Sequence, residues 1–358
     1  MVQPANASKI CFMSIVLVFT GSQLLLISLL TKKSSIFPRL AAGVQSSRLL
    51  DSGSGDKHQL NDTDTQCSPG HFQLNNDGIC HPMLTCKDIQ DSVIRIKHIG
   101  GGLVKKVYLA TWKKYQVSLV HLSHPYFNDY FLSAAKMLQQ FQATPFVTRL
   151  LGFCPSASIP AMVTEYHRFG SLENINSILK EKDEDNVVTR FKLCLDYVKI
   201  INFLHSSPTG THVMCDSRHL MKTLAQYLVT SDLHIVLNDL DILPVVDSSK
   251  GILTNCGPYQ VFGSFVAPEQ LWPFTGVKFN ESQMPGYDEK TDIWKIPAVV
   301  EYLLGEAVHG DRVRYILSQF HQKCRSNDPK LRPTAAEVLK EYLDVQQTLN
   351  IKRTKWQF

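Results

Sequence analysis

Apolar and polar positions divide the chain into segments of different kinds. Residues 10–31 carry no charged side chain, whereas the residues on both sides of them do. Residues 93–99 alternate apolar and polar positions, which predicts a strand, and a second strand-like segment over 108–112 follows a glycine-rich turn. Apolar positions over 191–205 recur at helical spacing. These patterns predict a fold that mixes strands and helices behind a long apolar segment.

The apolar segment is long enough to cross a membrane. A bilayer-spanning helix needs about 20 such residues, whereas the apolar core of a signal peptide usually has about 7–15. We therefore expect a transmembrane signal anchor over residues 10–31 and a short cytosolic tail over 1–9. A cleaved signal peptide and a buried core helix are the two alternatives.

The features around this segment disagree about which side of the membrane the rest of the chain occupies. Lys32 and Lys33 follow the segment and favour a cytosolic position by the positive-inside rule. Two glycosylation sequons, at Asn61 and Asn280, and eight of the nine cysteines lie beyond the segment and favour a lumenal position. We expect a lumenal domain on a flexible, Ser- and Gly-rich stalk over 32–66.

Composition and charge narrow the class of protein. The chain has 358 residues, of which 44% are hydrophobic and 19% are charged, and its formal net charge is +5. This composition excludes a disordered, collagenous or coiled-coil protein. Because the sequence contains no dense run of Lys or Arg, we do not expect nucleic acid as a partner. The residues after the stalk are numerous enough to bury a sizeable core.

Three cysteines cluster just after the stalk, at Cys67, Cys80 and Cys86. The segment that contains them is rich in Gly, Pro and Asn and shows little helical periodicity, which is typical of a loop held by disulfides. Zinc is the alternative, but the spacing lacks the close Cys-x-x-Cys pair that zinc sites use. We treat residues 67–92 as a Cys-rich N-terminal extension.

Six short motifs then follow one another in a characteristic order. They are Val-Thr-Glu-Tyr-His with Phe-Gly-Ser-Leu, Val-Met-Cys-Asp, Asn-Asp-Leu-Asp, Ala-Pro-Glu, Asp-Ile-Trp and Arg-Pro-Thr, at residues 163–172, 213–216, 238–241, 267–269, 292–294 and 332–334. Together with the glycine-rich turn, this order resembles that of the protein kinase family. The resemblance implies an α+β, bilobal protein kinase-like fold over residues 93–350, behind the N-terminal transmembrane helix. In that fold a small β-rich N-lobe precedes a larger helical C-lobe.

The resemblance implies ATP as the phosphoryl donor and suggests which residues bind it. Gly100 and Gly102 in the turn let the backbone approach phosphate oxygens, because glycine has no Cβ in the way. Glu165 and His167 fall in the segment that resembles the kinase hinge, whose backbone groups hold the adenine. For the glycines alone, a plain turn between two strands is the alternative interpretation.

The lysine that kinases carry on their third strand is missing. Val120 occupies its position, and Lys105 lies instead in the glycine-rich turn, where the with-no-lysine kinases carry their catalytic lysine. The resemblance implies that Lys105 supplies the charge for the α- and β-phosphates. A solvated hairpin lysine is the alternative. The glutamate that usually pairs with the lysine falls on Ala134, so we expect no switch that depends on that helix.

The resemblance also assigns the catalytic base and the metal ligands. Asp216, at the end of Val-Met-Cys-Asp, holds the position of the base. Counting back from Asp239 by the usual kinase spacing puts Gln226 at the position of the metal-binding Asn, behind an inserted turn. Gln keeps an amide oxygen that can coordinate a hard cation, and Asp239 and Asp241 add carboxylates. These residues imply Mg²⁺, with Mn²⁺ as a possible substitute.

The sequence does not determine how the cysteines pair, and we predict one arrangement. We expect one disulfide within the extension, one that joins the extension to the N-lobe, and one between the catalytic loop and the activation segment. Cys194 lies in an apolar helix and is expected to be a buried thiol, and Cys324 has no predicted partner. The predicted pairs are Cys67 with Cys80, Cys86 with Cys154, and Cys215 with Cys256.

Three departures from ordinary kinases make the chain similar to the glycan-phosphorylating branch of the family. They are Asp-Leu-Asp in place of Asp-Phe-Gly, the lysine in the glycine-rich turn, and the order of anchor, stalk and Cys cluster. This similarity implies transfer to the 6-hydroxyl of O-linked mannose in the GalNAc-GlcNAc-Man trisaccharide of α-dystroglycan. It also implies a single-pass type II protein of the endoplasmic reticulum membrane with a lumenal catalytic domain.

Two other functions stay open. Residues 239–241 form an Asp-x-Asp motif, which a type II membrane glycosyltransferase would also carry, although such an enzyme has no reason to carry the Ala-Pro-Glu and Arg-Pro-Thr motifs. A glycan-binding pseudokinase scaffold is the non-enzymatic alternative. A scaffold, however, has no need of a lysine that compensates for the lost one.

Overall fold

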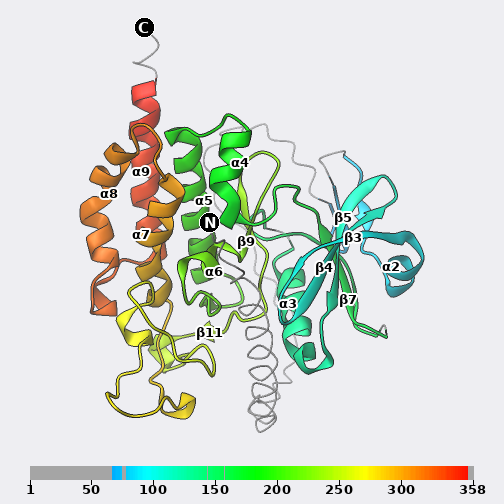
Figure 1. Ribbon diagram of the computed structural model, residues 1–358, viewed down its shortest axis with the longest axis horizontal. Coiled ribbons are helices and arrows are strands. Elements are labelled where there is room, and N and C mark those ends of the chain that lie inside the picture. Colours follow the sequence, from blue (N-terminus) through cyan, green and yellow to red (C-terminus); the bar gives the residue numbers. More distant parts are fainter. Residues whose placement is uncertain (1–66, 75–77, 143, 157, 354–358) are drawn as a thin grey trace, which may run out of the picture. The chain divides into compact units, whose positions relative to one another are not determined.

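The computed structural model describes residues 67–74, 78–142, 144–156 and 158–353 (Figure 1). These residues form a β-rich N-lobe, followed in the chain by a larger helical C-lobe, as the kinase resemblance implied. Asn61 and the predicted tail, anchor and stalk over 1–66 fall outside the described residues. The domain boundaries drawn from the sequence therefore stay predictions.

The fold-class prediction needs one correction, because it placed the kinase-like fold behind an N-terminal transmembrane helix. No helix in the described part of the chain is long and apolar enough to cross a membrane. The helices α5 (Val187–His205) and α9 (Ala335–Arg353) are long enough, but each carries several charged side chains. Residues 10–31, on which the prediction was based, lie outside the described residues.

A five-stranded antiparallel sheet forms the N-lobe. In spatial order its strands are β3 (Val93–Gly101), β4 (Lys105–Trp112), β5 (Tyr115–Leu122), β7 (Ala161–Glu165) and β6 (Leu150–Cys154). The strands predicted over 93–99 and 108–112 are thus confirmed within β3 and β4, and the glycine-rich turn joins them.

Successive side chains of β5 point to opposite faces of this sheet. Val117 and Leu119 belong to the core on the face that the Cys-rich extension covers. Val120 and Leu122 belong to the larger core that also contains the buried side of helix α3 (Asn128–Gln140), which follows the short 3-10 helix η1 (Pro125–Phe127). Both faces of the sheet are therefore covered at its centre.

The Cys-rich extension packs on the sheet as part of the N-lobe. It consists of β1 (His71–Phe72), β2 (His81–Pro82) and α2 (Cys86–Ser92). Thr85 is the N-cap of α2 and forms a capping box with Asp88. The Thr85 hydroxyl accepts from the Asp88 N–H, and the Asp88 carboxylate accepts from the Thr85 N–H. Disulfides join Cys67 to Cys80 and Cys86 to Cys154.

Helices dominate the C-lobe, and α5 lies at its centre (Figure 1). Helix α5 is buried along most of its length and contains the helical pattern predicted over 191–205, and it packs against both α7 (Lys290–Leu304) and α9. Asn186 caps its start, because the Asn186 Oδ1 accepts from two N–H groups of the first turn. The other helices of the lobe are α4 (Ile175–Glu181), α6 (Leu220–Leu224), α7 (Lys290–Leu304) and α8 (Gly310–Cys324).

Short elements of the C-lobe lie next to the loops that carry several of the six motifs. Two antiparallel pairs of strands flank the catalytic loop: β8 (Thr211–His212) with β11 (Val245–Val246), and β9 (Tyr227–Val229) with β10 (Ile235–Leu237). The remaining 3-10 helices are η2 (Leu172–Asn174), η3 (Ser248–Lys250), η4 (Pro268–Gln270), η5 (Glu281–Gln283) and η6 (Pro329–Leu331).

Candidate active site

Lys105 and Asp239 meet between the two lobes. Lys105 is the first residue of β4, opposite Leu122 of β5, and Asp239 follows β10 by two positions. The Lys105 Nζ donates a hydrogen bond to the Asp239 Oδ1, and both side chains are mostly buried. Val120, at the usual lysine position, is a buried core residue of β5. The lysine charge thus reaches the site from the neighbouring strand.

Carboxylates surround the ammonium group of Lys105. Burial alone lowers the pKa of Lys105, but the charges of Asp239, Asp241 and Asp216 outweigh it and hold that pKa above its ordinary value. Ala134 is a buried apolar residue of α3, so this helix offers no acidic partner there. The ion pair that ordinary kinases make with a helix glutamate is replaced by a pair with Asp239.

Gln226 connects the catalytic loop to Asp239. Its backbone oxygen accepts from the N–H of Asn238 at 2.8 Å and from that of Asp239 at 3.2 Å. Its side-chain Nε2 donates to the backbone oxygen of Lys222 at 2.8 Å, and the side chain is almost fully buried. Because the amide nitrogen is used within the fold, the amide oxygen is the atom that can coordinate a metal ion.

Gln226, Asp239 and Asp241 fit a magnesium site. Magnesium in nucleotide enzymes is usually held by one or two carboxylates together with substrate phosphates, which matches two carboxylates and one amide. No group of three or more His, Cys, Asp or Glu side chains in the described ranges forms a metal site by itself. Held by these residues, the ion would supply positive charge against the charge that develops on the phosphoryl group during transfer.

The surroundings shift the pKa values of the two carboxylates of this set in opposite directions. Burial raises the pKa of Asp239, but the Lys105 ammonium outweighs it, and the pKa of Asp239 falls below its ordinary value. Burial and the neighbouring Asp239 raise the pKa of Asp241, against the opposing charge of Lys105. The surroundings therefore favour ionisation of Asp239 more than that of Asp241, and a divalent cation would favour ionisation of both.

Asp216 lies at the open edge of the site, and a lysine that the sequence analysis did not single out contacts it. The Lys222 Nζ lies 2.6 Å from the Asp216 Oδ2, and the two side chains are 31% and 28% exposed. Lys222 belongs to α6, which the extra residues between Asp216 and Gln226 form. The inserted turn was visible in the sequence, but its contact with Asp216 was not.

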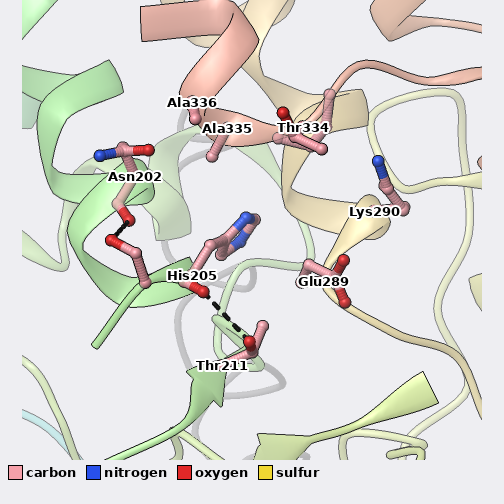
Figure 2. A pocket seen from close by; sticks show the side chains of 10 residues that line it. Asn202, His205, Thr211, Glu289, Lys290, Thr334, Ala335 and Ala336 are labelled. Carbon is pink, nitrogen blue, oxygen red and sulfur yellow. Dashed lines mark hydrogen bonds between the residues drawn. The ribbon is translucent and has the colours of Figure 1, made fainter. Parts of the chain in front are cut away.

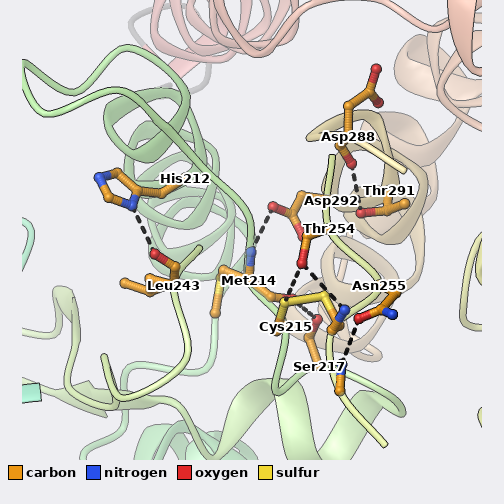
Figure 3. The surroundings of a disulfide bond; sticks show 12 residues. His212, Met214, Cys215, Ser217, Leu243, Thr254, Asn255, Asp288, Thr291 and Asp292 are labelled. Atoms are coloured by element: carbon orange, nitrogen blue, oxygen red, sulfur yellow. Dashed lines mark hydrogen bonds between the residues drawn. A yellow bond between two sulfur atoms is a disulfide. The ribbon is translucent and has the colours of Figure 1, made fainter. Parts of the chain in front are cut away.

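The disulfide between Cys215 and Cys256 holds the loop that carries Asp216 (Figure 3). Cys215 precedes Asp216 directly, and Cys256 belongs to the segment that leads to Ala-Pro-Glu. In ordinary kinases an Arg at the position of Cys215 binds a phosphorylated activation segment. Here a covalent bond fixes the same two segments. The three disulfides of the structure are the three predicted pairs.

A buried ion pair between Asp292 and Lys295 of α7 holds the residues on both sides of Asp216. The Asp292 Oδ2 accepts from the backbone N–H of Met214 at 3.0 Å (Figure 3). The Lys295 Nζ lies 3.5 Å from the Asp292 Oδ1 and donates to the Ser217 Oγ at 2.6 Å. Both charged side chains are almost fully buried. Lys295 was missed in the sequence, although a lysine three positions after an aspartate in an apolar helix signals a buried pair.

A second ion pair fixes the activation segment. Arg332 donates to Glu269 in a bidentate arrangement, with N–O distances of 2.6 and 2.8 Å. Arg332 also donates to the backbone oxygen of Lys290 at 2.9 Å. The Ala-Pro-Glu and Arg-Pro-Thr motifs are therefore joined by an ion pair that has a structural role.

The glycine-rich turn is shaped by Gly101, which the sequence analysis did not single out. A Cβ on Gly101 would lie 2.5 Å from the backbone oxygen of Lys105, so the hairpin requires glycine there. Gly100 and Gly102, the predicted phosphate-binding positions, have no atom within 4 Å of a Cβ built on them. The space beside both residues is open to a ligand.

The predicted hinge joins β7 to the C-lobe. The Glu165 carboxylate accepts from the Arg149 N–H at 2.9 Å and lies 3.3 Å from the His167 Nε2. Burial raises the pKa of Glu165, but these polar contacts outweigh it and lower that pKa. The Ser118 hydroxyl donates to the Glu165 backbone oxygen at 3.4 Å. The side chains thus hold the backbone that would meet adenine.

Three further predicted positions have no contact with this site. Asn280 is exposed, and its Oδ1 accepts from the backbone N–H and the hydroxyl of Ser282. Cys194 and Cys324 are buried free thiols, and burial raises the pKa of both, that of Cys324 to about 12.

A small cavity of the described residues lies elsewhere in the C-lobe and is lined by residues at the end of α5 and at the starts of α7 and α9 (Figure 2). It holds about 160 Å³ and lies beside His205, whose Nε2 is 3.3 Å from the Asp292 Oδ2. Asp216 is not among the residues that line it. We therefore assign it no part in catalysis.

The fold and this arrangement define a phosphotransferase of the protein kinase class. The described residues include Asp216 at the position of a kinase base, the carboxylates of Asp239 and Asp241, the amide of Gln226, and Lys105 in contact with Asp239. These are the parts that phosphoryl transfer from a nucleotide needs.

Comparisons with known proteins agree with this class. Residues 93–295 match the family model "Protein tyrosine and serine/threonine kinase". The human "Protein O-mannose kinase" is 46% identical over 80% of this chain and 82% of its own length. The Xenopus laevis protein of the same name is 46% identical over 78% of this chain and 80% of its own length. The chain belongs to the protein O-mannose kinase family and carries a protein kinase domain.

Proposed function

We propose that this kinase transfers the γ-phosphoryl group of ATP to the 6-hydroxyl of O-linked mannose in the GalNAc-GlcNAc-Man trisaccharide of α-dystroglycan. The observation that supports catalysis is the contact between Lys105 and Asp239. It puts a positive charge in the site although Val120 occupies the usual lysine position. The name of the relatives that are about 46% identical to this chain, protein O-mannose kinase, supports O-linked mannose as the acceptor.

Each residue of the site has a distinct role in this reaction. Asp216 accepts the proton of the acceptor hydroxyl as its oxygen attacks the γ-phosphorus. Lys105 neutralises charge on the phosphates from the nucleotide side, while Asp239, Asp241 and Gln226 hold the magnesium ion or ions. Because the fold fixes these groups before substrate binds, they need little reorganisation during transfer.

We place the reaction in the lumen of the endoplasmic reticulum. Three disulfides support this assignment, because disulfides persist in oxidising compartments. One of them, between Cys215 and Cys256, fixes the catalytic loop itself, so the active conformation depends on such a compartment.

The acceptor atom can be tested with a matched pair of glycans. The full chain is incubated with magnesium-ATP and either the trisaccharide or an analogue with 6-deoxymannose, and phosphorus NMR locates the phosphate in the product. We expect a phosphomonoester on C6 of mannose in the first case and no product in the second. Phosphate on another hydroxyl, or equal labelling of the analogue, would contradict the proposed acceptor.

A further inference from the structure

The small cavity beside His205 is lined mainly by polar residues (Figure 2). It lies where the end of α5 meets the starts of α7 and α9, and it holds about 160 Å³. This volume is much larger than the space that one water molecule needs. The cavity is therefore large enough for a small polar ligand.

Two hydrogen-bond acceptors line this cavity. The His205 side chain is only 8% exposed, and its Nε2 lies 3.3 Å from the Asp292 Oδ2. Because an ionised carboxylate only accepts, the Nε2 of a neutral His205 ring carries the proton, and its Nδ1 is left as an acceptor. Within the described ranges, neither this Nδ1 nor the Glu289 carboxylate has a hydrogen-bond partner, and both residues line the cavity.

Hydrogen-bond donors line the same cavity. Ala335 and Ala336 begin α9, and the N–H groups in the first turn of a helix have no partner within that helix. The Lys290 Nζ donates to the backbone oxygens of Arg332 and Pro333 at 2.9 and 3.2 Å, which leaves one of its three N–H donors. A helix start and an ammonium group both favour a bound anion.

We propose that this cavity is a binding site for hydrogen phosphate. The anion accepts hydrogen bonds from the start of α9 and from Lys290, while its own hydroxyl donates to the His205 Nδ1. The singly charged form has a second hydroxyl for the Glu289 carboxylate. Sulfate carries no hydroxyl at neutral pH, so it leaves both acceptors without a donor and adds charge beside Glu289. The site therefore selects a protonated oxyanion.

Two contacts connect this site to the catalytic loop. His205 contacts Asp292, and the Asp292 Oδ2 accepts from the backbone N–H of Met214 at 3.0 Å. Met214 lies two positions before Asp216. A hydroxyl that donates to the His205 Nδ1 fixes the ring tautomer that donates to Asp292. Bound phosphate should therefore hold Asp292 and the loop more firmly in place.

Calorimetry on the full chain tests the site without any acceptor glycan, so its outcome is independent of the proposed function. The nucleotide site is first filled with magnesium and a non-hydrolysable ATP analogue. Inorganic phosphate and sulfate are then titrated separately at neutral pH and equal ionic strength. We expect phosphate to bind at one site, about tenfold or more tightly than sulfate. Equal affinities for the two anions, or no binding of phosphate, would overturn the inference.

Variants locate the bound anion. Ala336→Leu fills the cavity from an exposed position and should abolish phosphate binding. Glu289→Gln removes the charge and adds N–H donors, so its affinity for sulfate should come within about threefold of that for phosphate. Glu306→Gln is the matched control, since Glu306 is exposed and does not line the cavity. Phosphate binding that survives Ala336→Leu, or equal behaviour of the two Gln variants, would contradict this site.

A second substitution covers the case in which Ala336→Leu does not fold. Lys290→Gln keeps a donor for the two backbone oxygens but loses the charge, and we expect it to bind phosphate about tenfold more weakly. Unchanged phosphate affinity in this variant would also overturn the inference.

Hydrogen exchange measures the connection to the catalytic loop. We expect phosphate to slow exchange of the Met214 N–H by about threefold or more in the unchanged chain, and sulfate to have no such effect. The control Glu306→Gln should respond as the unchanged chain does. Phosphate that binds in the cavity without slowing exchange at Met214 would overturn the connection.

Discussion

Lys105 donates a hydrogen bond to the carboxylate of Asp239, although 134 positions separate the two residues in the sequence. In ordinary kinases the corresponding lysine comes from the next strand and pairs with a helix glutamate. Here the strand carries Val120 and the helix carries Ala134 at those positions, and both are buried apolar residues. The lysine and its partner have therefore been replaced together.

Replacing Lys105 tests whether this contact is catalytic. We expect Lys105→Met to lower kcat by about 100-fold or more, because a charge beside the developing phosphate charge is lost. The neighbouring Lys106 is exposed on the same strand, and Lys106→Met is the matched control. Steady-state rates of ADP release decide between them. Equal rates for both variants would make Lys105 a solvated hairpin lysine.

Removing the disulfide at the catalytic loop should lower both stability and activity. The bond between Cys215 and Cys256 closes a loop with a sequence separation of 41, so its removal by two Ser substitutions should cost about 3–4 kcal/mol of unfolding free energy. We also expect kcat to fall, because the loop before Asp216 is released. Urea unfolding and steady-state kinetics measure the two effects.

The disulfide between Cys67 and Cys80 is the control for that experiment. It lies in the Cys-rich extension and has a sequence separation of 13. Its removal should also cost roughly 3 kcal/mol of unfolding free energy, but should leave kcat unchanged. If kcat falls equally in both double variants, the bond at the catalytic loop has no special role in activity.

The buried pair of Lys295 and Asp292 should be sensitive to removal of one charge. Lys295→Met leaves the Asp292 carboxylate buried without its cation and removes the hydrogen bond to Ser217, so we expect a loss of about 3–5 kcal/mol of unfolding free energy. Adding Asp292→Asn should recover part of that loss. Chemical denaturation of the single and double variants measures it, and strictly additive losses would show that the pair is not coupled.

His321 predicts a contribution to acid lability. Burial lowers its pKa to about 4 from the ordinary 6.5, and its Nε2 lies 2.8 Å from the hydroxyl of buried Tyr342. Between these two values the unfolded chain holds a proton on His321 that the folded chain lacks. Stability therefore falls as the pH drops from 6.5 to 4, by about 2–3 kcal/mol from this group.

A non-titrating substitution isolates this contribution. His321→Gln keeps a polar group opposite Tyr342 but cannot take up the proton. We expect its unfolding free energy, measured in urea between pH 4 and 7, to depend less on pH than that of the unchanged chain. Parallel curves for the two proteins would show that His321 is not the group responsible.

Glycosylation at Asn280 tests the compartment. Asn280 is exposed beside η5, so the sequon is accessible on the folded domain. We expect chain made in mammalian cells to lose apparent mass on treatment with an N-glycosidase, and Asn280→Gln to remove that part of the change. The Asn61→Gln variant is the second protein to test, because Asn280 is then the remaining one of the two glycosylation sequons. No change in mobility for the Asn61→Gln variant would contradict a lumenal position of this surface.

The sequence predicted the residues whose role follows from their place in a motif. Asp216, Asp239 and Lys105 could be assigned in this way, because motif order fixes which loop each one occupies. Lys222 and Lys295 could not, because their partners are determined by how an inserted helix and a buried helix pack against the catalytic loop. Whether two charged side chains form an ion pair depends on their distance in the folded chain. Their positions in the sequence do not give that distance.

The same distinction separates the glycines of the turn. Gly100 and Gly102 were chosen from their spacing, whereas Gly101 is the residue that the hairpin requires, because a Cβ there would meet the Lys105 backbone oxygen. That requirement depends on the register between β3 and β4, which includes irregular pairing near the turn. Periodicity indicates that a hairpin exists but does not fix its register.

Phosphoryl transfer by the full chain tests the central claim most directly. Transfer of γ-³²P from magnesium-ATP is measured to the mannose trisaccharide and to a generic kinase peptide, with Asp216→Asn beside the unchanged chain. We expect label on the trisaccharide, none on the peptide, and a loss of about 100-fold or more in Asp216→Asn. Binding of the trisaccharide without any label on either acceptor would contradict a catalytic site and would favour a glycan-binding scaffold.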